Sequence, residues 1–225
     1  MRINPWVVGA VGGAMVLLFS ARKAVAQGVS MAFDIIAGRA DKQAKWAKEF
    51  ATIAAPIVAK YNLPLQICVA QAATESAWGA AAPGGNYFGI KGKGPAGSTT
   101  VTTQEEFTPG TRTTIKDSFA AYGSTAQSID GWCRFVTASR YVPPEGSNVG
   151  ARLLWIWAAG YATASNYATF VSSVANSVAW RLGPEFAINL SPAQKQLAAT
   201  LSQMKPEARR PYVQQLAKNG QYPLT

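Results

Sequence analysis

Apolar residues recur at three- and four-residue spacing through most of this chain, and this pattern restricts it to a largely helical fold. In residues 41–61 they follow one face of a helix, which Pro56 is expected to bend. A second helix is predicted from Asn62, which can cap it, with Pro64 in the first turn. Further helices are predicted over residues 124–138, 148–159 and 165–182, and two short polar helices after residue 191, separated at Pro206.

One stretch departs from the helical pattern. Residues 81–114 are rich in glycine, proline, threonine and serine, and they contain the β-prone segment STTVTTQEEF. This composition predicts loops and a hairpin. Helices with one small β excursion are typical of a lysozyme-like α-helical domain with a small β-hairpin lobe, so the predicted fold class is mainly α.

The amino-terminal segment carries an uncharged apolar run over residues 5–21, bracketed by Arg2 and by the pair Arg22 and Lys23. At roughly 1.5 Å per residue, such a helix lies at the lower limit for spanning ~30 Å of hydrocarbon. A cleaved signal peptide is the alternative, because residues 24–26 are small enough for a cleavage site. Two positive charges before that site are more typical of a retained anchor, so an N-terminal apolar helix that stays in a membrane is favoured.

The chain contains no histidine. Histidine is the most frequent proton-transfer residue of enzymes and the commonest protein ligand of metals. Its absence excludes Ser-His-Asp triads, Cys-His pairs and His-ligated zinc, and with them serine hydrolases, cysteine peptidases and zinc amidases. Carboxylate chemistry remains, and only eleven acidic residues can supply it. Neither a metal nor another cofactor is expected.

Cysteine usage and net charge constrain the chain less. Cys68 and Cys133 lie in apolar helical stretches, and we expect small buried side chains rather than a disulfide bridge. The net charge of +10 is concentrated in the flanks, residues 1–50 and 181–225. Basic flanks suit an anionic surface, although a solvated helix face has the same composition. No nucleic-acid-binding motif accompanies the charge, so no specific nucleic acid is expected as a partner.

Glu75 is the strongest candidate for a catalytic acid. Cleaving a glycosidic bond needs a carboxyl group that stays protonated near neutral pH, which requires partial burial. Glu75 lies near the end of an otherwise uncharged helix, with Cys68, Gln71 and Ala72 on its own face and Trp78 just beyond. Such surroundings raise a carboxyl pKa by desolvation. The alternative is an exposed glutamate without a role.

Five sequence blocks follow one another in a fixed order: QAATESAWG, NYFGIKGKG, TQEEF with the later Phe119, Tyr122 and Ser124, then Ser139-Arg140-Tyr141, and AGYAT with the later Asn166 and Tyr167. Together they cover roughly residues 42–182 and resemble glycoside hydrolase family 73, which includes flagellar rod-assembly hydrolases and bacterial autolysins. The resemblance implies a peptidoglycan hydrolase that cleaves the β-1,4 glycan backbone as an N-acetylglucosaminidase.

The resemblance also implies catalytic residues. Glu75 matches the family's general acid, and Tyr161 matches a cleft tyrosine that positions the substrate's acetamido group. Glu106 matches the hairpin acid that acts as base or charge stabiliser, unless the substrate's own acetamido group takes that part. Only one of two adjacent strand residues can face the cleft, and we choose Glu106 over Glu105 because Phe107 follows it.

The resemblance further implies substrate-binding residues, most of them aromatic side chains whose faces would stack on sugar rings. These are Trp78, Asn86, Tyr87, Phe88 and Tyr122, with core packing as the alternative for Tyr87 and Phe88. Thr74 and Ala77 depart from the family pattern, which commonly has a larger apolar residue and a glycine there, so packing at this helix end is expected to differ.

Four segments are expected: a membrane anchor or signal (1–27), a linker (28–41), the catalytic domain (42–184) and a helical extension (185–225) that docks on a partner. This layout suits local perforation of the wall by an enzyme of the cell envelope, facing periplasm or wall, or of a phage virion. Two alternatives remain. One is a lytic transglycosylase or muramidase, although its usual Gly-Leu-Met-Gln block is missing. The other is a non-catalytic structural component of a phage virion or envelope machine.

Overall fold

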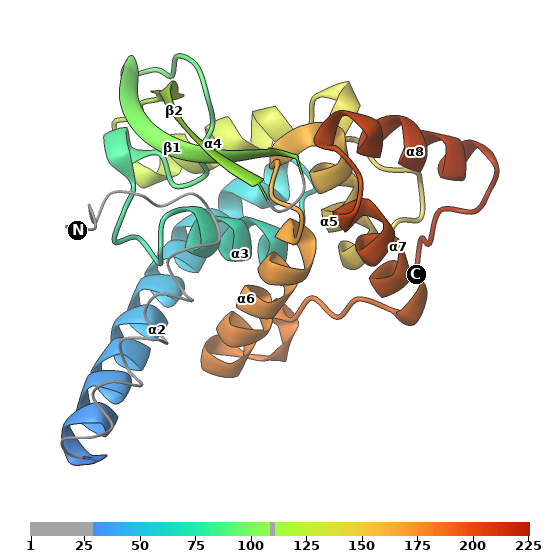
Figure 1. Cartoon of the computed structure of the whole chain (residues 1–225). Helices are drawn as coiled ribbons and strands as arrows, with labels where there is room; N and C mark the ends of the chain where they lie inside the picture. The colour runs from blue at the N-terminus through green and yellow to red at the C-terminus, as the bar shows by residue number, and fades with distance from the viewer. Residues whose placement is uncertain (1–28, 109–110) are drawn as a thin grey trace.

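The computed structural model describes residues 29–108 and 111–225 (Figure 1). Within this part of the chain, the helices are α2 (Val29–Lys60), α3 (Leu65–Glu75), α4 (Thr125–Val136), α5 (Val149–Ile156), α6 (Tyr167–Leu182), α7 (Pro192–Ser202) and α8 (Pro206–Lys218). Two antiparallel strands, β1 (Ser98–Thr108) and β2 (Thr111–Ala120), form the β lobe. The prediction of a mainly α fold with a small hairpin is confirmed.

Four short helical turns connect these elements: η2 (Pro83–Gly85), η3 (Ser139–Tyr141), the π turn η4 (Trp157–Tyr161) and η5 (Pro184–Phe186). The predicted N-terminal apolar helix lies outside the described residues. Over residues 29–108 and 111–225, no helix is both long enough and apolar enough to cross a bilayer.

The core is built around α3, which packs against α2 and α6. Its side chains from Ile67 to Thr74 are all buried, because alanine, valine, isoleucine and cysteine make this helix apolar on nearly every face. Cys68 and Cys133 are both buried and free, as expected. The buried position of α3 matters for the site because Glu75 is its last residue.

Helix α2 is longer than the sequence pattern predicted. It begins at Val29, so the residues expected to form a linker are helical, and its N-terminal turns project away from the body (Figure 1). Its buried residues Ala47, Phe50, Ala54 and Val58 are spaced by three or four residues and form the stripe that faces α3 and α4. Pro56 does not end the helix, which continues to Lys60.

The hairpin is joined at its base to the loop after η2. The Ala120 N–H donates to the Ile90 carbonyl (2.8 Å), and the Gly92 N–H donates to the Ser118 carbonyl (2.8 Å). The strands pair from Ser98 opposite Ala120 to Glu105 opposite Thr113, after which the register becomes irregular. This pairing fixes Glu105 at the last regular position of β1.

The C-terminal extension packs on the rest of the molecule. Its residues Phe186, Ile188, Leu197, Leu201 and Val213 belong to the same hydrophobic core as α3 and α6. Helix α8 lies against η4, and the Tyr222 hydroxyl donates to the Ala151 carbonyl (2.6 Å). The extension is therefore structurally continuous with the preceding helices.

Candidate active site

A cleft of about 340 Å³ lies between the end of α3, the loop after η2, strand β1 and the segment after η4. Polar side chains from all four elements line it, among them Glu75, Lys91, Thr103, Glu105, Tyr161 and Thr163. The hairpin provides one wall, because its base is bonded to the loop after η2. The cleft thus collects side chains that lie far apart in the sequence.

Glu75 occupies the point where α3 ends in an unusual turn. Ala77 (φ 49°) and Trp78 (φ 59°) both adopt left-handed backbone conformations, which cost a non-glycine residue about 1 kcal/mol or more each. Gly79 follows at φ 80°, and a Cβ there would lie 2.1 Å from the Trp46 ring nitrogen. The turn therefore stores strain directly beside the acid.

Both departures from the family pattern have a physical consequence at this turn. A glycine at position 77 would adopt φ 49° without the steric cost that Ala77 bears. The hydroxyl of Thr74 is buried and makes no hydrogen bond to the described residues, whereas an apolar side chain would have no such group to satisfy. This helix end is thus less favourably packed than the family pattern would make it.

The surroundings of Glu75 favour its protonated form. Burial raises the pKa of Glu75 from 4.5 to about 7, a hydrogen bond with the Tyr167 hydroxyl opposes this shift, and the charge of Glu105 adds to it. The carboxyl group still reaches the cleft, where a Cβ on Gly89 would lie 3.5 Å from its Oε2. With a pKa of about 7, a large share of the Glu75 carboxyl groups keep the proton near neutral pH and present it to the cleft, which is what a general acid needs.

A buried chain of hydrogen bonds orients the Tyr167 hydroxyl. The indole N–H of Trp132 donates to Gln71 Oε1 (2.8 Å), and Gln71 Nε2 donates to the Tyr167 oxygen (3.1 Å). Because that oxygen accepts from Gln71, its own proton is available to Glu75. Sequence reasoning missed this role of Tyr167 and Gln71. The available signal was the position of Gln71 four residues before Glu75, on the same helix face.

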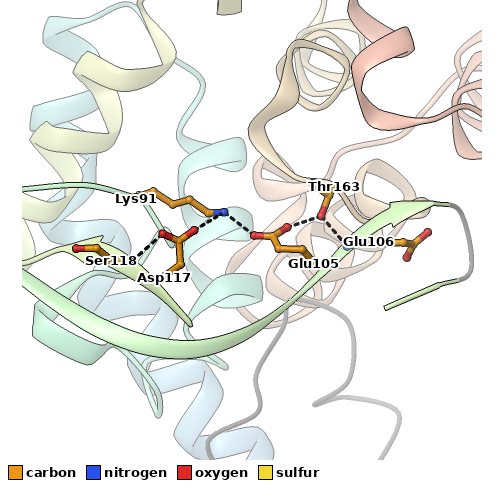
Figure 2. Close-up of polar contacts among 6 residues, drawn as sticks. All are labelled: Lys91, Glu105, Glu106, Asp117, Ser118 and Thr163. Carbon is orange, nitrogen blue, oxygen red and sulfur yellow. Dashed lines mark hydrogen bonds and ion pairs between the residues drawn. The ribbon is translucent and has the colours of Figure 1, made fainter. Parts of the chain in front are cut away.

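Glu105 is held by two partners (Figure 2). Lys91 Nζ lies 2.7 Å from its Oε1 and 2.8 Å from Asp117 Oδ2, and the Thr163 hydroxyl donates to Glu105 Oε2 (2.5 Å). Burial disfavours the charged ammonium, but the hydrogen bonds to Asp117 and Glu105 outweigh it and raise the pKa of Lys91. The result is a fixed negative charge in the cleft, opposite the acid.

The structure differs from the prediction for the neighbouring glutamate. Glu105 lines the cleft, whereas the Glu106 carboxylate points away from Lys91 and Thr163 and is buried elsewhere (Figure 2). The negative charge of Glu106 acts on Arg209 of helix α8, where it opposes the lowering of the Arg209 pKa by burial. Glu106 therefore lies on the side of α8. Successive side chains of a strand point to opposite faces, whereas residues i and i+2 share one face. An aromatic residue at position 107 therefore could not indicate which face residue 106 takes.

Tyr161 lines the cleft as predicted. Its hydroxyl donates to the Phe88 carbonyl (2.9 Å), and the nearby charge of Glu75 adds to the burial that raises the pKa of Tyr161. With its proton engaged there, the phenolic oxygen can accept a hydrogen bond from a substrate N–H group. The cleft position and the acceptor geometry are compatible with holding an acetamido group.

Asn86 and Phe88 also contribute to the cleft wall, but their side chains are used internally. Asn86 Nδ2 donates to the Ile90 carbonyl (2.8 Å), and its Oδ1 accepts from the backbone N–H groups of Phe88 and Ile90. The Phe88 ring is buried and stacks on Trp132, with centroids 5.3 Å apart. Asn86 therefore shapes the loop that carries the cleft, and Phe88 packs in the core.

The remaining three predicted sugar-binding residues lie outside the lining of this cleft. Trp78 packs edge-on against Trp46, and Tyr87 packs against Phe50. Tyr122 lies so close to Gly131 that a Cβ there would meet its ring at 2.6 Å. The family resemblance implied a sugar-binding role for these aromatics but could not show which side of the loop each one would occupy.

Comparison with known proteins agrees with this geometry. Residues 51–179 match the family model described as "Glucosaminidase: Mannosyl-glycoprotein endo-beta-N-acetylglucosaminidase". The chain is 33% identical over 125 residues to exo-glucosaminidase LytG of Bacillus subtilis. This match covers 51% of this chain and 44% of LytG. It thus spans less than half the length of that relative.

Solved structures show the same fold. The catalytic domain of the autolysin Auto from Listeria monocytogenes superposes with a TM-score of 0.50 at 28% identity, over 61% of this chain and 84% of that chain. An N-acetylmuramoyl-L-alanine amidase structure from Staphylococcus aureus gives a TM-score of 0.50 at 22% identity, over 62% of this chain and 44% of that chain. The second likeness is one of fold alone.

Proposed function

Because this chain belongs to the glucosaminidase family of glycoside hydrolases, family 73, we propose that it hydrolyses the β-1,4 glycan backbone of peptidoglycan as an N-acetylglucosaminidase. The observation that carries the proposal is one cleft in which a carboxyl group with a pKa of about 7, Glu75, faces the anchored carboxylate of Glu105. Two carboxyl groups with such different surroundings are the requirement for glycoside hydrolysis.

The roles follow from the two environments. Glu75, whose raised pKa of about 7 keeps its proton through mildly acidic pH and in about half of the molecules at pH 7, donates that proton to the leaving glycosidic oxygen. The carboxylate of Glu105, paired with Lys91 and bonded by Thr163, activates water or stabilises the positively charged sugar. Tyr161 accepts the acetamido N–H, which orients the ring and allows the substrate's own carbonyl to assist.

Product ends test the proposal. Purified peptidoglycan is digested with the full chain, reduced with borohydride and analysed by mass spectrometry. We expect glucosaminitol ends. Muramitol ends would make the chain a muramidase, and anhydromuramic acid would make it a lytic transglycosylase. If no new ends appear with the wild-type chain, the hydrolase proposal itself is contradicted.

We further propose that the chain works at the cell envelope or in a phage virion, held at a membrane by residues 1–27 for local perforation of the wall. The support is the apolar run over residues 5–21 and its basic flanks. Intact-mass measurement with membrane fractionation tests this proposal. An uncleaved chain that pellets with membranes is expected, and a mature protein beginning after residue 26 in the soluble fraction would contradict it.

A further inference from the structure

Helix α8 lies outside the residues that match the glucosaminidase family, yet one of its side chains reaches the cleft wall. Arg209 is 1% exposed, and its guanidinium lies 4.7 Å from the centroid of the Trp157 ring. Its Nε donates to the Leu201 carbonyl and its Nη1 donates to the Thr163 carbonyl, both at 3.0 Å. A side chain from the C-terminal extension thus bonds the segment that lines the cleft.

Thr163 passes this contact on to the hairpin. Its hydroxyl donates to Glu105 Oε2 (2.5 Å) and accepts the backbone N–H of Glu106 (3.1 Å), as Figure 2 shows. Residues 162–164 have no regular secondary structure between η4 and α6, so their position depends on such tertiary bonds. A second tether comes from Trp157, whose indole N–H donates to the Ala164 carbonyl (3.0 Å).

The choice of an arginine here has a cost that packing alone does not explain. A buried guanidinium loses its hydration, and an apolar side chain of similar volume is often equally stabilising in such a place. Arg209 instead donates from Nε and Nη1 to two backbone carbonyls and lays its planar group over an aromatic ring, while its buried Nη2 makes no hydrogen bond to the described residues. This arrangement fixes the carbonyl of Thr163 in direction as well as in distance.

We propose that Arg209 is a positioning residue for the reaction. Through Thr163 it sets the place of the Glu105 carboxylate, which makes this one side chain of α8 part of the support of the active site. The inference rests on the proposed function of Glu105. It differs from a purely structural role of the extension, because it predicts an effect on turnover that is transmitted through a single threonine.

The first test uses the full chain and a matched pair of variants. Arg209→Met keeps most of the side-chain volume and removes the donors, whereas Val213→Ala loosens the packing of the same helix at a fully buried position. We expect Arg209→Met to lower kcat about tenfold with little change in KM, and Val213→Ala to change kcat less than about twofold, each measured where the variant is folded. Equal losses of kcat in both variants would overturn the proposal.

A double-mutant cycle then tests transmission through Thr163. In a Thr163→Val background, Arg209→Met should lower kcat by less than about twofold further, because the link is already broken. Losses that multiply would show that Arg209 does not act through Thr163. If Arg209→Met fails to fold, Arg209→Lys replaces it, since an ammonium on a shorter reach cannot reproduce the two-carbonyl geometry.

Crystal structures of the variants separate this inference from the proposed function. The distance from Thr163 Oγ1 to Glu105 Oε2 should lengthen beyond hydrogen-bonding range in Arg209→Met and persist in Val213→Ala. If wild type and Glu75→Gln degrade peptidoglycan equally, the proposed function fails, and this distance still decides whether Arg209 positions Glu105. An unchanged distance in Arg209→Met overturns the inference whatever the activity.

Discussion

The ammonium group of Lys91 lies 2.7 Å from the carboxylate of Glu105, on the wall of the cleft that Glu75 faces. The same ammonium lies 2.8 Å from Asp117 on the second strand. One cation therefore ties both strands of the hairpin to the loop that carries the cleft. This contact fixes where negative charge lies relative to the acid, and several expected outcomes depend on it.

Replacing Lys91 with methionine should affect turnover more than stability. The side chain is 49% exposed, so the ion pair contributes at most about 1 kcal/mol to folding. Without it, two uncompensated acids face each other, and kcat/KM should fall at least about tenfold. Steady-state kinetics and urea unfolding measure the two effects. Lys93→Met is the control, because it removes the same charge from an exposed position two residues away. It should leave both kcat/KM and the free energy of unfolding nearly unchanged.

The two neighbouring glutamates should differ sharply. Glu105→Gln removes the charge that lines the cleft and should lower kcat about 100-fold, whereas Glu106→Gln should lower it less than about tenfold. Turnover of purified peptidoglycan by both variants, with circular dichroism to confirm folding, makes the comparison. A greater loss in Glu106→Gln would assign the second catalytic acid to Glu106 instead.

Tyr167→Phe should move the alkaline limb of the pH profile. The hydrogen bond from Tyr167 stabilises the charged form of Glu75 and holds its pKa below the value that burial alone would give. Its removal raises that pKa, so the acid stays protonated to higher pH. The fall of kcat/KM above about pH 7 should therefore begin later in the variant than in wild type. A limb that stays in place or moves to lower pH would contradict this assignment.

Burial of Glu75 also predicts a pH dependence of stability. Its pKa of about 7 in the folded chain exceeds the ordinary 4.5, so folding is stabilised by the bound proton below about pH 4.5. That contribution is lost as the pH rises through about 7. We therefore compare the free energy of unfolding of Glu75→Gln with that of wild type at two pH values. The difference in favour of the variant should be larger at pH 8 than at pH 4.5 by up to about 3 kcal/mol. Denaturant titrations at both pH values check this, and a constant difference would be the contrary result.

Local patterns predicted most of the fold. The three- and four-residue spacing identified the buried stripe of α2, and the predicted helix starts near residues 124 and 191 agree with α4 and α7, which Ser124 and Ser191 cap. The start of α2 at Val29 was not predicted, since residues 28–41 were expected to form a linker. The second strand reaches Ala120 because it pairs with β1 and bonds the Ile90 loop, which are tertiary effects that composition does not report.

The site was predictable only in part, for a similar reason. Glu75 and Tyr161 belong to recognisable blocks, and the structure brings both to one cleft. The contacts that hold the opposite wall of the cleft join residues far apart in the chain, such as Thr163 with Glu105 and Arg209 with Thr163. Neither periodicity nor spacing reports which distant side chains meet, so Lys91, Thr163 and Arg209 emerged only from the structure.

In the proposed reaction, the carboxyl group of Glu75 donates the proton that breaks the glycan strand. The most direct measurement is the rate at which wild type and Glu75→Gln release new reducing ends from purified peptidoglycan at pH 6, with both chains shown to be folded. We expect a loss of at least about 100-fold in the variant. Equal rates for the two chains would contradict it.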